Sequence, residues 1–249
     1  NFTGLFKNSS LLEVLIYSSL ILYFMISASP VTNADSLDYH LHIGKQIASD
    51  GNIPLSLNHL HSHLFGNGEI IIAIGILAGT EQLNSIVQFC GLISVLGIIR
   101  SRKNKNDFTI YLLSCPLIIF FISSIKPQFF FIASTTFVFG LLINQEILKK
   151  EILFKKYILS FILLCLASQA KFSFMLSLGV LGLYILYDSY KNKIFLKTTF
   201  TFIPIILLII FPTIYWKSLY YNSSLFELIL SPFPTNDPGL ERFKTYLIQ

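Results

Sequence analysis

The sequence predicts an all-α polytopic membrane protein with about seven transmembrane helices, and three observations lead to this prediction. Hydrophobic residues make up 53% of the 249-residue chain and charged residues only 12%, with a mean hydropathy of +0.67. Water-soluble domains of this length rarely have such a composition. The apolar residues form long runs, whereas a membrane β-barrel would show alternating segments of about ten residues. The Lys and Arg residues cluster between these runs.

Seven apolar segments approach the length of about 20 helical residues that a bilayer crossing requires. The first is followed by Pro30, and two later pairs join at Lys126-Pro127 and at Lys171 with almost no loop, as in tight hairpins. The predicted spans are residues 11–29, 83–99, 108–125, 127–144, 157–170, 172–187 and 198–215.

Residues 30–82 form a first loop that is long enough to fold. Within it, residues 35–49 are predicted to form an amphipathic helix, which ends at Asp50-Gly51-Asn52 because glycine favours the turn after a helix. Residues 69–79 are apolar but too short to cross a bilayer, so we expect a re-entrant or interfacial helix there. Residues 216–249 form a polar tail after the last span.

Basic residues lie mainly on one predicted side of the spans. The positive-inside rule makes that side cytoplasmic, so the first loop and the tail lie on the extracytoplasmic side of the inner (plasma) membrane. The role of the basic residues in setting membrane orientation also accounts for the pI of about 9.0. We therefore predict no nucleic-acid partner. The cytoplasmic basic residues are Arg100, Arg102, Lys103, Lys105, Lys149, Lys150, Lys155, Lys156, Lys191, Lys193 and Lys197.

Two carboxylates and an imidazole follow the first span. Asp35 and Asp38 lie three residues apart, so they would share one helix face. In a structural interpretation, Asp35 caps the helix that follows. In a catalytic interpretation, Asp35 is a general base or metal ligand supported by Asp38, because ionisable groups at a membrane are usually functional. Tyr39 and His40 are then candidates for contact with the substrate.

Four further charged residues are candidates for substrate binding. Lys126 and Lys171 stand at hairpin tips, where they either extend to headgroups or water, or bind the phosphate of an anionic lipid substrate. Glu69 begins the interfacial helix, where it either interacts with the helix dipole or orients the substrate. Arg242 lies further along, in the tail.

The sequence predicts no certain cofactor. His59, His61 and His63 alternate, so an extended segment would direct three imidazoles to one side, as a divalent metal site could use. No local carboxylate completes the set, and hydrogen bonds to water or lipid phosphate explain these histidines more simply. A divalent metal therefore stays an open alternative. The sequence has no P-loop, dinucleotide-binding glycine motif or zinc-protease helix.

Several short motifs, taken in order, resemble those of GT-C membrane glycosyltransferases, in the branch of the protein mannosyltransferases and aminoarabinose transferases. The resemblance covers nearly the whole chain, which we therefore treat as one module, residues 1–249. The motifs are Asp35-Ser36-Leu37-Asp38-Tyr39-His40-Leu41, Gly51-Asn52-Ile53-Pro54, Gly68-Glu69-Ile70-Ile71, Ala170-Lys171-Phe172-Ser173, Tyr215-Trp216-Lys217 and Ser231-Pro232-Phe233-Pro234.

This resemblance implies transfer of a sugar from a polyprenyl-phosphate carrier to a lipid, glycan or protein acceptor at the outer membrane face. The first-loop acid, here Asp35, would be the catalytic base. Cationic groups such as Lys171, Lys126 and the more distant Arg242 would offset charge on the departing phosphate. Many relatives carry an acidic pair where this chain has Ser36 after Asp35, which leaves the metal requirement open.

Two other classes of function compete with the enzyme. A transporter or lipid flippase would use the same acids and lysines along a translocation path, but we find no internal repeat, and the ionisable residues gather on one side. A non-catalytic membrane subunit is the third alternative. The chain begins at Asn1 rather than Met, and members of the resembled family usually continue further, so we expect a fragment of a longer protein.

Overall fold

The computed structural model describes residues 11–34, 36–52, 66–100, 105–126, 128–143 and 150–221, and these residues form helices and turns without any β-strand. The all-α class predicted from composition is therefore confirmed. In chain order the elements are α2 (Leu11–Ala28), the π-helix η1 (Ser36–His40), α3 (Leu41–Asp50), α4 (Gly68–Leu77), α5 (Leu83–Arg100), α6 (Lys105–Leu113), α7 (Pro116–Ile122), α8 (Phe129–Ile143), α9 (Lys150–Ala170), the 3-10 turn η3 (Phe172–Phe174), α10 (Met175–Lys191), α11 (Phe195–Ile209) and α12 (Phe211–Tyr221).

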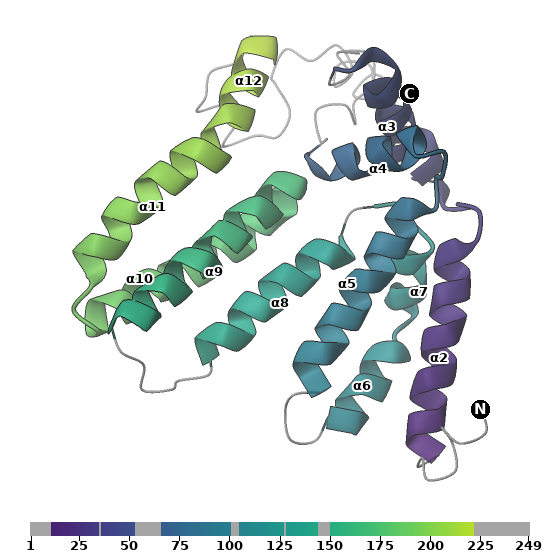
Figure 1. Cartoon of the computed structure of the whole chain (residues 1–249), viewed down its shortest axis with the longest axis horizontal. Coiled ribbons are helices and arrows are strands. Elements are labelled where there is room, and N and C mark those ends of the chain that lie inside the picture. Colours follow the sequence, from purple (N-terminus) through teal and green to yellow (C-terminus); the bar gives the residue numbers. More distant parts are fainter. Residues whose placement is uncertain are drawn as a thin grey trace, which may run out of the picture.

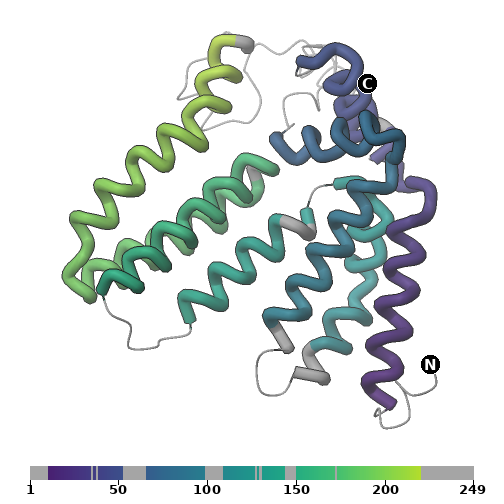
Figure 2. The backbone as a smooth tube through the Cα atoms, viewed as in Figure 1, coloured from purple at the N-terminus to yellow at the C-terminus, as the bar shows by residue number. Residues whose placement is uncertain are grey.

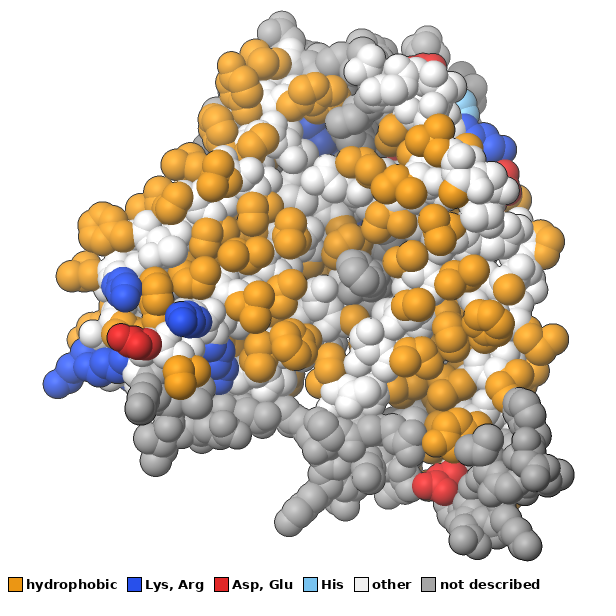
Figure 3. Space-filling model, in the orientation of Figure 1, with side chains coloured by type: hydrophobic (Ala, Val, Ile, Leu, Met, Phe, Trp, Pro, Cys, Tyr) orange, Lys and Arg blue, Asp and Glu red, His pale blue; other side chains and the backbone are white. Residues whose placement is uncertain are grey.

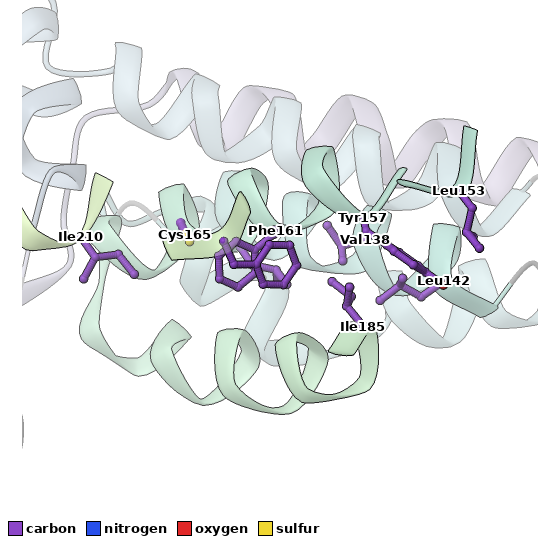
Figure 4. Packing of buried hydrophobic residues seen from close by; sticks show 10 residues of the cluster. Val138, Leu142, Leu153, Tyr157, Phe161, Cys165, Ile185 and Ile210 are labelled. Carbon is purple, nitrogen blue, oxygen red and sulfur yellow. The ribbon is translucent and has the colours of Figure 1, made fainter. Parts of the chain in front are cut away.

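The long helices run side by side in two packed groups (Figures 1 and 2). In the first group, α2, α5, α6 and α7 enclose a core that includes Ile16, Leu92 and Ile122. In the second, α8 to α11 enclose another core, which includes Val138, Phe161 and Ile185 (Figure 4). The ring centroids of Phe161 and Phe202 stack 3.6 Å apart there. Helix α5 packs against α8 and joins the two groups.

Helices α3 and α4 lie across one end of the long helices (Figure 1). They approach closely because Gly44 has no side chain: a Cβ there would lie 2.5 Å from Cγ2 of Ile72. Buried Val31, Leu41, Ile72 and Ile125 form a small core between this pair and the bundle end. The two short helices predicted in the first loop are thus present as η1 with α3, and as α4.

Two predicted spans are not continuous helices. Residues 108–125 divide into α6 and α7 because Pro116, at the start of α7, cannot continue the hydrogen bonding of a preceding helix. Residues 198–215 divide at Ile210, where α11 and α12 meet at a bend of 42°. Pro212 follows this bend and lacks the N–H that would bond back into α11.

By length and apolarity, one helix in the described ranges could cross a bilayer, namely α2. The number becomes two if the bent pair α11 and α12 counts as one span. Several other predicted spans are shorter or broken, such as α8 with 15 residues and α7 with seven. The structure therefore supports fewer full-length spans than the seven expected from hydropathy.

The two ends of the bundle differ in charge. Helix α9 starts at Lys150 and its last turn meets the first loop, so its basic start and the first loop lie at opposite ends. Helix α10 packs against α9 and ends at Lys191, and α11 carries Lys197 in its first turn. Figure 3 shows this group of Lys or Arg side chains at the lower left, beside a hydrophobic middle zone.

Candidate functional site

A buried histidine–glutamate contact joins the two short helices of the first loop. His40 and Glu69 are each only 3% exposed, and His40 Nδ1 lies 2.9 Å from Glu69 Oε1. The other carboxylate oxygen, Oε2, accepts a hydrogen bond of 2.7 Å from the backbone N–H of Gly66. Because a carboxylate only accepts, Nδ1 of His40 carries the shared hydrogen. The second ring nitrogen, Nε2, is buried and has no hydrogen-bond partner among the residues that the structure describes.

Local sequence explains why these two side chains meet. His40 ends η1 and directly precedes α3, and its ring lies 4.0 Å from that of Tyr39. Glu69 occupies the first turn of α4, where a carboxylate interacts favourably with the helix dipole. Both residues were predicted as substrate-binding residues, but their pairing was not predicted. The pair links the start of α3 to the start of α4.

The segment before α4 docks on the end of α9. The backbone N–H of Asn67 donates to the carbonyl oxygen of Gln169 at 2.9 Å, which satisfies one of the carbonyls left free where a helix ends. Gly66 lies so close that a Cβ there would be 2.3 Å from the carbonyl oxygen of Ala170. The first loop therefore contacts the residues immediately before Lys171.

We expect Gly66→Ala to lower the free energy of unfolding by about 1–3 kcal/mol, the usual cost of forcing extra atoms into a packed site. The added methyl group would meet two backbone carbonyls, which cannot move aside as a flexible side chain would. Thermal unfolding of the purified protein measures the change. Gly97→Ala is the matched control, because a Cβ at Gly97 meets no described atom within 4 Å apart from the local backbone of its own helix. Equal melting temperatures for the two variants would contradict this account.

A second contact ties the first loop to the segment before Lys126. The Oγ of buried Ser36 accepts a hydrogen bond of 3.3 Å from the backbone N–H of Ile125, whose carbonyl accepts from Nδ2 of Asn84. Lys126 is only 7% exposed, and its ammonium lies 5.1 Å from the ring centroid of Phe120. Lys126 thus stands beside the first loop with most of its side chain buried.

A third lysine, Lys217 on α12, lies within the electrostatic range of Glu69. Sequence reasoning did not select Lys217 as a site residue. A usable signal existed, because Lys217 is the one charged residue of α12 and stands among aromatic residues.

Some of the predicted site residues lie in the described part of the structure, and others lie outside it. His40, Glu69, Lys126 and Lys171 lie at one end of the bundle, and Tyr39 accompanies His40. The backbone of Asp38 lies in η1, but its side chain is outside the described part of the structure. Asp35, Arg242 and the three histidines His59, His61 and His63 lie outside the described residues, so their roles stay predictions.

A metal site stays a prediction as well. Within the described ranges, no group of three or more His, Cys, Asp or Glu side chains could hold a metal ion. The His40–Glu69 pair supplies at most two donors, and Glu69 already accepts from the Gly66 backbone.

Fold and site together define a helical protein whose first loop folds into a polar, partly buried cluster across one end of a helix bundle. This chain belongs to the DUF1420 family, whose N-terminal domain profile matches residues 1–249. No curated protein and no solved structure matches the chain.

Proposed function

We propose that this protein is a membrane glycosyltransferase. It transfers a sugar from a polyprenyl-phosphate-linked donor to a lipid, glycan or protein acceptor on the extracytoplasmic face of the inner membrane. One observation carries the proposal: the first loop makes hydrogen bonds to residues 169 and 125, close before Lys171 and Lys126 in the chain. Two basic residues from distant parts of the chain thus follow directly on contacts to one loop, and a phosphate-bearing donor would require cations there.

The surface of the helices supports a multi-pass placement in the membrane. Large hydrophobic side chains are exposed on helices of both groups, for example Leu22 on α2, Leu176 on α10 and Leu208 on α11. Figure 3 shows hydrophobic side chains spread over the middle of one face, and extensive apolar surface is rare on soluble monomers and suits contact with lipid. The charge difference between the bundle ends agrees with the proposed orientation, in which the basic end is cytoplasmic.

The proposed reaction divides its roles between acid and cations. An acceptor hydroxyl or amine attacks the anomeric carbon of the donor sugar, and the bond from that carbon to the phosphate oxygen breaks. Asp35 takes the acceptor proton, and polyprenyl phosphate leaves with the bonding electron pair. Lys171, Lys126 and Lys217 bind the phosphate and offset its charge as it departs. His40 and Glu69 hold the loop in place through their buried contact.

The test is donor turnover by purified full-length protein. The donors are radiolabelled polyprenyl-phosphate mannose, glucose, arabinose and aminoarabinose, with membranes of the producing cell as the source of acceptor. We expect one donor to lose its sugar to the acceptor fraction. No transfer from any of the four, together with donor-independent lipid scrambling in proteoliposomes, would refute the proposal and favour a flippase.

Lys171→Ala is expected to reduce this transfer about 100-fold, because an electrostatic group aimed at the developing charge contributes on that scale. Lys171→Arg keeps the positive charge and should retain more of the activity. Lys150→Ala is the matched control, since Lys150 is exposed at the opposite end of neighbouring α9. Initial rates at saturating donor check the prediction. Equal losses in the Lys171 and Lys150 variants would contradict it.

A further inference from the structure

A second candidate binding site lies at the opposite end of the bundle, at the turn between α10 and α11. A cavity of about 780 Å³ opens there, lined by Tyr190, Lys191, Lys193, Phe195, Leu196 and Lys197. Three of these residues are lysines within seven positions of the chain. In the proposed orientation this turn faces the cytoplasmic leaflet.

The backbone of this turn places a lysine where glycine is usually found. The N–H of Ile194 donates to the carbonyl oxygen of Ser189, and the N–H of Lys193 donates to that of Tyr190, each at 3.0 Å. These two bonds form a Schellman motif, whose residue after the C-cap adopts a left-handed conformation and is usually glycine. Lys193 has a φ of 58°, in the region that costs a residue with a side chain about 1–2 kcal/mol. The residue with the strained left-handed backbone is therefore a lysine, Lys193, and it lines the same cavity as Lys191 and Lys197.

The carboxylate nearest to the turn, that of Asp188, already accepts hydrogen bonds from other residues. Asp188 accepts hydrogen bonds from the hydroxyl of Tyr157 and from Nδ2 of Asn192. It acts on Lys191 only through its field, and no salt bridge in the described part of the chain joins the three lysines to a carboxylate. The turn thus keeps a net positive charge that suits an anionic group.

Two of the lysines are held against aromatic rings. The ammonium of Lys191 lies 4.6 Å from the ring centroid of Tyr187, and that of Lys197 lies 4.3 Å from the centroid of Phe154. Such contacts restrict where the two cations lie without neutralising them. Exposed Tyr190, Leu196 and Phe200 border the turn, so apolar surface continues from the basic group along the helices.

We propose that the α10–α11 turn binds the phosphate of an anionic phospholipid, with the acyl chains along the exposed apolar side chains of α11. A free phosphate compound would use the lysines but not this apolar border. The proposal rests on the membrane placement proposed above and is independent of glycosyl transfer. Basic groups at the cytoplasmic end of membrane helices attract anionic lipids by about fivefold per lysine in affinity.

The experiment is native mass spectrometry of the purified full-length protein in detergent, titrated separately with phosphatidylglycerol and phosphatidylcholine. Wild type should retain phosphatidylglycerol in preference to phosphatidylcholine. Lys193→Gly should retain phosphatidylglycerol about fivefold less while melting at the same or a higher temperature, because glycine relieves the left-handed backbone. A lower affinity with unimpaired stability separates lipid binding from folding.

The matched control is Lys45→Gln, which removes an exposed lysine from α3 at the other end of the bundle. It should leave phosphatidylglycerol retention unchanged. Equal retention of both lipids by wild type, equal phosphatidylglycerol retention by wild type and Lys193→Gly, or displacement of the lipid by millimolar inorganic phosphate would each overturn the proposal. None of these results depends on whether the protein transfers sugar, so the two proposals fail separately.

Discussion

Replacing Asp35 with Asn is expected to lower sugar transfer about 1,000-fold, within the range that positioned acid–base catalysis contributes. The amide has nearly the same shape as the carboxylate but cannot accept the acceptor's proton. The hydroxyl of the next residue, Ser36, accepts a hydrogen bond from the Ile125 backbone, and the substitution removes neither of these two groups. Single-turnover rates with the donor identified for the wild type measure the effect.

Two controls accompany this variant. Asp50→Asn changes an exposed acid at the end of α3 and should transfer sugar at the wild-type rate. Donor binding by Asp35→Asn, measured separately, should stay close to wild type, because a general base acts mainly on the chemical step. A variant that transferred sugar at full rate would remove Asp35 from the reaction. Asp38 would then be the remaining acid of the motif to test.

Hydropathy predicted the positions of helices better than their continuity. Apolar runs placed α2, α5 and α8 within a few residues, since a helix can form wherever such a run is long enough. The divisions at Pro116 and near Pro212 depend on where proline interrupts hydrogen bonding relative to neighbouring helices. Mean hydropathy over a window of residues does not detect a single missing backbone N–H. It therefore joined α6 with α7, and α11 with α12, into one predicted span each.

The sequence identified several residues of the candidate site, but it did not predict the contacts between them. Glu69 and His40 were selected because ionisable residues stand out in an apolar chain. Their contact spans 29 residues and depends on the close approach of α3 to α4 at Gly44. Lys217 comes from still further along the chain, so its place within the electrostatic range of Glu69 depends on tertiary packing that no local pattern encodes.

Glu69→Ala is expected to lower the free energy of unfolding by several kcal/mol, because each buried donor left without an acceptor costs about 1–3 kcal/mol. The substitution would leave the His40 ring and the Gly66 N–H buried without their acceptor. Thermal unfolding in detergent measures the loss. Glu69→Gln should lose less, because one amide oxygen still accepts a hydrogen bond from one of the two donors.

The matched control uses an exposed ion pair of this region. Glu81 lies 3.4 Å from Lys45, and both side chains are about half exposed, so Glu81→Ala should cost less than about 1 kcal/mol. In a His40→Phe background, Glu69→Ala should cost less than in wild type, because the imidazole that needed an acceptor is already gone. Full additivity of the two substitutions would mean that His40 and Glu69 do not depend on each other, and the contact would not be what holds α3 against α4.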